Sequence, residues 1–365
     1  MPPGSERPHI VLVGAGHAHL LAVPAIRAGL PQARILLVDP APAATYSGML
    51  PGVLAGHYRL RDASVDLTGF ARRHGIEVMQ AAAVAVGDGA LELAGPAGHR
   101  RVGFDLASLD IGSHARMPEV AGFEAHAVAV KPLGGFVARV GPLLEAQQGL
   151  PVAVIGAGVA GVEIALALVH RHAARVTLIE AGPTIGRGLA PRSVALLERR
   201  LQAQGVTVAA GARVQAVSAE GVELAGDPRI PARLVIGAAG ARAAEWLAGC
   251  LPVDERGFVR VDPTLQVQGR GTLFAAGDCA AMSHAPRPKA GVYAVRQAPI
   301  LARNIVALAR GAPLVPYAPQ DDFLKLVTLG ERAAVAEWRG LTLQGRWLWR
   351  LKDRIDRGFM ARLGH

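Results

Sequence analysis

One arrangement of residues occurs twice in this chain of 365 residues, and it constrains the fold more than any other feature. In the first copy an apolar run at 10–13 leads into a turn that contains Gly14 and Gly16. An apolar helix is expected over 20–29, and the apolar run after it ends at Asp39. A buried strand, a glycine turn, a helix and a strand that ends in an acid form the dinucleotide-binding fingerprint in its required setting.

The second copy is complete. The apolar run 152–155 leads into a G-x-G-x-x-G turn made by Gly156, Gly158 and Gly161, and the run after the next helix ends at Glu180. Two such units about 140 residues apart are far more specific than one alone. The chain is therefore expected to hold two dinucleotides on two parallel sheets.

Each position of the fingerprint has a physical task. The first glycine permits the tight turn, the second lets a pyrophosphate approach the helix N-terminus, and the acid accepts a hydrogen bond from a ribose hydroxyl. These tasks fall to Gly14, Gly16 and Asp39 in the first unit. His19 stands where a third glycine is expected, so an ordinary strand–turn–helix is an alternative for this unit alone. His17 and His19 are interpreted as loop and cap residues, with His17 able to touch a phosphate.

The loop after Asp39, residues 40–52, is rich in turn-forming residues. It leaves a strand at its carboxyl end, where ligands bind in open α/β sheets. Tyr46, Met49 and Pro51 suit packing against a flat ring, and a plain connecting loop is the alternative. Elsewhere the pattern predicts helices over 62–74, 133–148 and 193–204, and short strands resembling a meander at 77–79, 83–86 and 91–93.

Composition narrows the class of protein. The hydrophobic content of 51% suits parallel sheets covered on both faces. Two cysteines without a C-x-x-C, and scattered histidines, give no sign of a disulfide scaffold or a metal site. The net charge of +10 indicates either contact with an anionic membrane or polyanion, or a bias toward arginine; no nucleic-acid-binding motif is present. Residues 1–8 lead directly into the first strand without a signal peptide, which predicts a cytoplasmic location.

A third motif, the strand 272–276 followed by Gly277-Asp278, completes a resemblance. The chain is similar to flavoproteins with two dinucleotide-binding domains, the pyridine-nucleotide–disulfide reductase superfamily and its type II NADH dehydrogenase and sulfide:quinone reductase relatives. Segments 45–52, 287–297 and 352–360 look like the flavoprotein module found joined to selenide, water dikinase. The resemblance implies an α/β fold with two Rossmann-like FAD/NAD(P)-binding domains, glutathione-reductase-like, and a small C-terminal α+β tail. It implies an FAD-binding domain at 1–125 and 263–315, an NAD(P)H-binding domain at 126–262 and a C-terminal region at 316–365.

The resemblance also implies roles for single residues. FAD would lie with its pyrophosphate over 14–19 and its ribityl chain at Asp278, and NADH, in preference to NADPH, would lie on the second unit. Lys289 at the start of the next helix would face the flavin N1/O2 edge, or be an exposed cation. Glu163 would lie near the nicotinamide and flavin, or cap its helix. The expected catalytic residues are Glu163 and Lys289, and the expected cofactor-binding residues are Gly14, Gly16, His17, His19, Asp39, Tyr46, Pro51, Gly112, Gly156, Gly158, Gly161, Glu180, Gly240, Gly277, Asp278, Lys289 and Ala290.

Two departures from the family pattern matter. No cysteine precedes Cys250, which excludes a thiol–disulfide reductase of the usual type. Only Gln297 is available on the helix after Gly277-Asp278, where quinone reductases tend to carry glutamines. The first hypothesis is an FAD enzyme that passes electrons from NADH to a quinone or another small acceptor. The alternatives are a sulfide- or selenium-linked oxidoreductase using Cys279 and Cys250, and a flavin-bound partner protein without turnover.

The C-terminal segment has its own pattern. Strands are expected at 323–327 and 333–336, followed by a basic amphipathic helix over 346–363 in which Gly358 is an interruption. Five large apolar residues recur at helical spacing: Trp347, Leu351, Ile355, Phe359 and Leu363. Such a helix fits the anionic surface of a membrane, here its cytoplasmic face. Packing on the protein itself or in a homodimer is the alternative, because an amphipathic stripe does not identify its partner.

Overall fold

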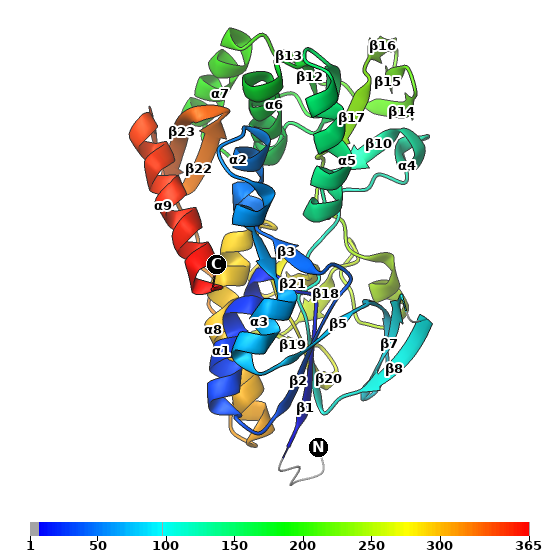
Figure 1. Cartoon of the computed structure of the whole chain (residues 1–365), viewed down its shortest axis with the longest axis vertical. Helices are drawn as coiled ribbons and strands as arrows, with labels where there is room; N and C mark the ends of the chain where they lie inside the picture. Colours follow the sequence, from blue (N-terminus) through cyan, green and yellow to red (C-terminus); the bar gives the residue numbers. More distant parts are fainter. Residues whose placement is uncertain (1–6, 97, 365) are drawn as a thin grey trace.

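The computed structural model describes residues 7–96 and 98–364, and its core is two separate sheets, one mixed and one parallel (Figure 1). The first sheet has eight strands, in which those from β20 to β5 run parallel. In spatial order they are β21 (Ala280–Met282), β18 (Val259–Val261), β19 (Gln266–Val267), β20 (Arg270–Ala275), β9 (Leu106–Leu109), β1 (His9–Val13), β2 (Arg34–Asp39) and β5 (Glu77–Gln80). This sheet therefore combines an early and a late part of the chain.

The second sheet is built from the chain between these two parts, and all its pairings are parallel. Its order is β10 (Ala127–Ala129), β17 (Leu234–Gly237), β11 (Pro151–Ile155), β12 (Arg175–Glu180) and β13 (Thr207–Ala210). The α-helices of the described residues are α1 (His17–Gly29), α2 (Leu50–Leu54), α3 (Leu67–His74), α4 (Phe123–His126), α5 (Leu133–Ala146), α6 (Val159–His172), α7 (Pro191–Ala203), α8 (Gly291–Ala309) and α9 (Arg346–Arg362). The predicted α/β class with two Rossmann-like cores is confirmed.

Both sheets are covered on two faces, which explains their nearly continuous apolar strands. In Figure 1, α1, α3 and α8 lie on one side of the first sheet, and a small antiparallel sheet lies on the other. That small sheet is β6 (Ala82–Val86), β7 (Ala90–Gly95) and β8 (Gly98–Gly103). The second sheet packs one face on α5–α7 and the other on β14 (Val214–Ser218), β15 (Gly221–Leu224) and β16 (Asp227–Pro231).

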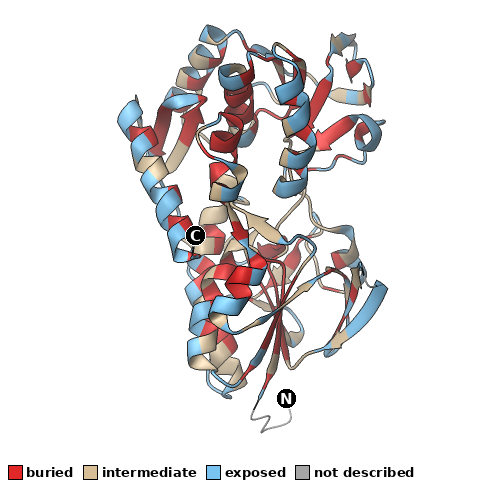
Figure 2. Ribbon diagram, viewed as in Figure 1, coloured by how far each residue is buried: buried red, intermediate tan, exposed pale blue. Residues whose placement is uncertain are grey.

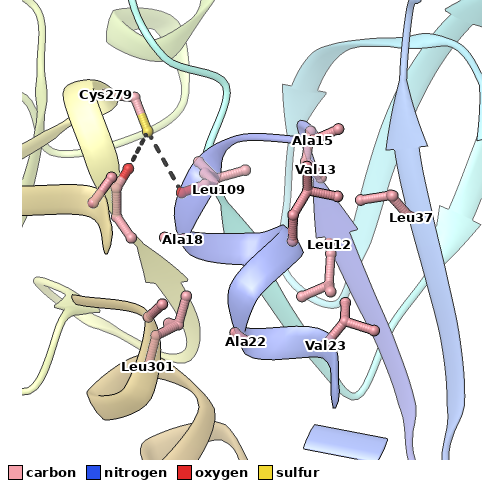
Figure 3. Packing of buried hydrophobic residues seen from close by; sticks show 14 of the residues in the cluster. Leu12, Val13, Ala15, Ala18, Ala22, Val23, Leu37, Leu109, Cys279 and Leu301 are labelled. Carbon is pink, nitrogen blue, oxygen red and sulfur yellow. Dashed lines mark hydrogen bonds between the residues drawn. The ribbon is translucent and has the colours of Figure 1, made fainter. Parts of the chain in front are cut away.

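Small residues on α1 set the distance between α1 and α8. Ala18 and Ala22 face Leu301 of α8, while Val23 faces Leu12 of β1 (Figure 3). The side chains of these residues are all fully buried. Burial of a leucine or valine side chain contributes about 1.5–3 kcal/mol, so this contact anchors the late part of the chain on the early part.

The C-terminal region forms a third, antiparallel sheet and a long helix. The predicted strand pair is confirmed as β22 (Lys325–Leu329) and β23 (Glu331–Trp338), and a third strand, β24 (Leu341–Gly345), was not expected from the pattern. Helix α9 follows at once and runs alongside both units, with one face buried (Figure 2). The expected interruption at Gly358 is wrong, because α9 continues through it without a break.

Three expectations about boundaries change. The helix predicted over 62–74 begins at Leu67, because the Asp66 carboxylate caps it by accepting the N–H groups of Thr68 and Gly69. The preceding residues instead form β4 (Ser64–Asp66), which pairs with β3 (Ala43–Thr45). Strand β5 joins the parallel sheet, so the meander consists of β6, β7 and β8. Strand β18 belongs to the first sheet although it precedes the predicted boundary at 262.

No helix among the described residues is both long and apolar enough to cross a membrane. The expectation about a signal peptide depends on the chain start, and residues 1–6 lie outside the described residues.

Candidate nucleotide-binding sites

The first glycine turn is shaped by a close approach and by Asp39. Gly14 has φ +91°, and a Cβ atom there would lie 2.4 Å from the carbonyl oxygen of Asp110. The Asp39 carboxylate accepts the N–H groups of Ala15 and Ala41, at 2.7 and 2.9 Å. Gly16, at the N-cap of α1, has no side chain, and the N–H groups of Ala18 and His19 in the first turn donate to the Asp110 carboxylate.

The second turn repeats this construction. Gly156 has φ +101°, and a Cβ on Gly161 would lie 1.9 Å from the Gly156 carbonyl oxygen, so only glycine fits. The Glu180 carboxylate accepts the N–H groups of Ala157 and Gly182, at 2.8 and 2.9 Å. Gly158 is the N-cap residue of α6 and makes no side-chain cap. Both turns therefore have the close glycine approach and the tethered acid that the fingerprint predicts.

His19 replaces the third glycine by making a hydrogen bond to the carbonyl that a glycine would pack against. Its Nδ1 lies 2.7 Å from the Gly14 oxygen and its Nε2 lies 2.8 Å from the Ser108 hydroxyl. The ring is fully buried, and burial lowers its pKa to about 4. Neither ring nitrogen is left for a ligand, so the structure places His19 as a positioning residue of the turn.

His17 and the 40–52 loop meet the C-terminal helix. The His17 ring contacts the edges of Tyr46 and Phe359, with centroids 5.2 Å apart in both cases. Tyr46 stacks on Phe359 at 4.4 Å and donates its hydroxyl to Asp356. Burial lowers the pKa of His17 to about 4, so the ring is neutral at pH 7. Pro51 is buried in the first turn of α2. A face of Tyr46 expected for a flat ligand is thus covered by α9.

The Gly277-Asp278 turn carries an ion pair that joins the two domains. The Asp278 carboxylate accepts from Lys131 at 2.8 Å and from Ser113 at 2.9 Å. Burial acts to raise the pKa of Asp278, but Lys131 and Ser113 hold it below its usual value. The buried Gln297 accepts the Gly277 N–H at 2.7 Å and so fixes the turn from α8. The sequence predicted only a linker at Lys131, although a lone lysine between two dinucleotide units was a usable signal.

Gly112 and Gly240 lie in the loops that follow β9 and β17, with φ +69° and +67°. Open space surrounds the Cα of each, which leaves room beside both turns.

Comparison with known proteins decides what kind of chain this is. Residues 8–298 match the sequence model of the pyridine nucleotide-disulphide oxidoreductases. The chain belongs to the pyridine nucleotide-disulphide oxidoreductase family. Membership of this family implies binding of a flavin and of NAD(P)H.

Individual relatives share about a third or less of their aligned residues with this chain. An NADH dehydrogenase-like protein of Mycobacterium tuberculosis is 35% identical over 197 residues, which is 49% of each chain. A demethylphylloquinone reductase of Synechocystis is 28% identical over 68% of this chain and 64% of its own length. The chain thus spans about half of the mycobacterial protein.

Solved structures show the same fold. The sulfide:quinone oxidoreductase of Aquifex aeolicus has a TM-score of 0.81 at 20% identity, covering 98% of this chain and 91% of that one. NDH2 of Plasmodium falciparum in complex with NADH has a TM-score of 0.79 at 13% identity, covering 98% and 97%.

Although the family name refers to a disulphide, both cysteines of this member are free thiols. Cys279 is fully buried, and its Sγ points to the carbonyl oxygens of Ala276 and Leu109 (Figure 3). Burial raises the pKa of Cys279 to about 12. The more exposed Cys250 donates its Sγ–H to Trp246, one helical turn away. An accessible thiolate beside the Asp278 turn is therefore absent among the described residues, which removes the observation behind a sulfur relay.

Lys289 and Ala290 precede α8. Lys289 Nζ donates to the Ala280 carbonyl oxygen at 2.5 Å and lies 3.9 Å from the centroid of the Phe258 ring. Burial lowers the pKa of Lys289, although Cys279 and Asp278 act in the opposite direction. Ala290 is the N-terminal cap position of α8 and makes no side-chain cap. Lys289 is thus half-buried rather than an exposed cation.

Glu163 lies one turn into α6, and the alternative that it caps this helix is wrong. Its Oε1 accepts both the N–H and the hydroxyl of Thr328 in β22, at 2.8 Å each. Burial raises the pKa of Glu163, while the nearby Lys352 opposes this. Lys352 donates to Asp356 at 2.5 Å and to the Gly48 carbonyl oxygen at 2.6 Å. Glu163 is thereby part of a buried polar cluster that joins α6, the 40–52 loop and the C-terminal region.

Proposed function

We propose that this protein is an FAD-dependent oxidoreductase that accepts hydride from NADH and passes the electrons to a quinone. The observation that carries the proposal is the pair of matched glycine turns, each tied to an acid and each at the carboxyl end of its own parallel sheet. When bound, FAD would supply the capacity to take two electrons from NADH and release them to an acceptor.

The residues of the first unit fit FAD. A pyrophosphate would lie at the start of α1, where the turn admits no Cβ on Gly14 or Gly16. Asp39 would accept an adenosine ribose hydroxyl with lone pairs that its main-chain donors leave free. Asp278 would hold the ribityl chain, and Lys131, at 2.8 Å, keeps that carboxylate ionised.

NADH is the preferred nucleotide in this proposal because of Glu180. Its carboxylate is fixed by two main-chain N–H groups at the position where a ribose is held. A carboxylate accepts ribose hydroxyls and repels a 2′-phosphate. Ala181 and Gly182 follow it, and neither supplies a cation for that phosphate.

A quinone is proposed as the acceptor because the named relatives include a demethylphylloquinone reductase and a sulfide:quinone oxidoreductase. The buried Cys279 offers no support for the sulfide- or selenium-linked alternative. A surface around β24 supports a membrane location for such an acceptor. Most of the exposed large apolar side chains among the described residues come from the C-terminal region, and we call this set the apolar patch: Leu324, Trp338, Leu341, Leu343, Trp347 and Ile355.

The apolar patch differs from the stripe predicted on the C-terminal helix. Phe359 and Leu363, at 7% and 2% exposure, pack on the protein and are not available to a membrane. Trp347, near the start of α9, is 55% exposed, and Leu341 and Leu343 of the preceding strand β24 are 67% and 54% exposed. Aromatic and aliphatic side chains next to exposed arginines fit the interface of an anionic bilayer.

The function is tested by anaerobic reduction with NADH followed by steady-state turnover with a water-soluble quinone. We expect a yellow protein with one FAD per chain, bleaching on addition of NADH, and quinone-dependent reoxidation. A protein that cannot be reconstituted with FAD would remove the basis of the proposal. Reduction by NADH without turnover by any quinone would favour the flavin-bound partner protein. Bleaching by sulfide or selenide in place of NADH would favour the sulfur-linked alternative.

A further inference from the structure

A buried acid lies at the first pyrophosphate cradle. Asp110 follows β9 and is 3% exposed. Its Oδ2 accepts the N–H groups of Ala18 and His19, at 2.8 and 3.2 Å, in the first turn of α1. A Cβ on Gly16 would lie 2.2 Å from its carboxyl carbon, and a Cβ on Gly277 would lie 2.3 Å from its Oδ1. The carboxyl group is thus enclosed between the two turns that would hold the flavin nucleotide.

The second unit shows that the fold does not need this acid. The Asp110 N–H donates to the Val13 carbonyl oxygen, and the Ala238 N–H donates to that of Ile155, both at 2.8 Å. The first fingerprint glycine packs against this position or its neighbour in both units. Ala238 is therefore the structural counterpart of Asp110. The second unit has the methyl group of Ala238 at this position, whereas the first unit has the carboxyl group of Asp110.

The charged neighbour that acts on the Asp110 carboxyl is another acid, Asp278. Its acidic neighbour Asp278 is already paired with Lys131. No ion pair to Asp110 is present among the described residues. A bound pyrophosphate would bring two further negative charges to the same enclosed space. Charges of one sign repel strongly where water is excluded, so an ionised carboxylate here opposes binding.

Three of the other titratable groups near the cradle are neutral at pH 7. His17 and His19 both have a pKa lowered to about 4 by burial and are neutral. Burial raises the pKa of the Cys279 thiol to about 12, so it is neutral too. Lys289 directs its ammonium group to a main-chain carbonyl oxygen. Asp110 differs from these three groups, because its pKa lies near neutral pH.

We propose that Asp110 binds FAD as the neutral carboxylic acid and donates its O–H proton to an oxygen of the pyrophosphate. This inference rests on the proposed binding of FAD to the first unit. Its consequence is that each molecule of the protein with ionised Asp110 must take up one proton to hold FAD.

The pH range over which FAD affinity should change follows from the burial of the Asp110 carboxyl group. Burial, with a smaller effect of Asp278, raises the pKa of Asp110 to about 7, although the N–H groups of His19 and Ala18 act against this. Below this value the acid is neutral before FAD binds, and affinity is constant. Above it, the dissociation constant rises by up to about tenfold for each pH unit.

The test measures the dissociation constant of FAD from the apoprotein at several pH values between about 6.5 and about 8.5, with flavin fluorescence as the signal. For the natural sequence we expect the dissociation constant to rise about five- to tenfold over the last pH unit. Asp110→Asn keeps a hydrogen-bond donor and cannot ionise, so its affinity is expected to be flat. Asp110→Ala copies the second unit and is expected to be flat as well. Asp39→Asn is the matched control, because it should bind more weakly but keep the pH dependence.

Calorimetry in two buffers of different ionisation enthalpy gives a readout that needs no variant. At about pH 8 the natural sequence is expected to take up close to one proton on binding FAD, and Asp110→Asn none. Proton uptake near zero in the natural sequence, or the same pH dependence in Asp110→Asn, would overturn the inference while leaving FAD binding intact. Failure of every form to bind FAD would overturn the proposed function as well.

Discussion

Restoring the missing third glycine of the first fingerprint is expected to destabilise the folded protein. His19→Gly would complete G-x-G-x-x-G in the first unit. It would also leave the Gly14 carbonyl oxygen and the Ser108 hydroxyl buried without the partners they now have at 2.7 and 2.8 Å. A buried polar group left unpaired costs about 1–3 kcal/mol, and the lost ring leaves a cavity. We expect the free energy of unfolding to fall by about 3–5 kcal/mol.

His19→Gln is the matched control, since its amide is able to donate to Gly14 and accept from Ser108 without titrating. Because the folded pKa of His19 is about 4, below its unfolded value near 6.5, folding favours the neutral ring. The stability it contributes is complete above about pH 6.5 and is lost as pH falls toward 4, by about 3 kcal/mol. Urea unfolding at saturating FAD across this range should show a smaller loss for His19→Gln. His19→Gly as stable as the natural sequence at neutral pH would refute this reasoning.

Three further predictions follow from the site and the surface. Lys131→Met should weaken FAD retention by about 1.5–3 kcal/mol, measured by flavin release, because the carboxylate it pairs with loses a charged donor; unchanged retention would contradict the ion pair. Glu180→Ala should lower kcat/KM for NADH by about ten- to a hundredfold and narrow the preference over NADPH, and equal constants for both nucleotides in the natural sequence would count against it. Leu341→Ser with Trp347→Ser should reduce sedimentation with anionic vesicles at unchanged Tm, whereas Leu143→Ser, on α5, should not; equal sedimentation of both variants would separate the apolar patch from the membrane.

Much of the fold could be predicted because its strands are short, apolar and bounded by glycine. Both fingerprints, the acid at each second strand and the beginning of α9 at Arg346 follow from local patterns. Strand β4 was missed because its residues continue a helical pattern, and the cap at Asp66 that ends this pattern is visible only in three dimensions. Strand β24 was missed for a similar reason, because its pairing with β23 and not its composition defines it.

The site was harder to predict because its contacts join distant parts of the chain. Asp278 and Lys131 are separated by the whole second domain, and Glu163 meets Thr328 from a region that belongs to neither fingerprint. The sequence could have singled out Asp110, because it is an acid that directly follows a buried apolar strand. Its partners on α1 lie about 90 residues earlier, so the sequence gives no direction for its side chain.

The division of the first sheet between two parts of the chain has a consequence for synthesis. Strand β9 pairs with β20, and the partners Leu109 and Ala275 are 166 residues apart in the sequence. The intervening parallel sheet, β10–β17, is contiguous and can fold as soon as it leaves the ribosome. Until β20 arrives, β9 is an open edge of four residues that are all buried in the finished protein. A stalled or truncated chain therefore exposes a flat apolar edge, and chaperone binding is expected to concentrate in this interval of elongation.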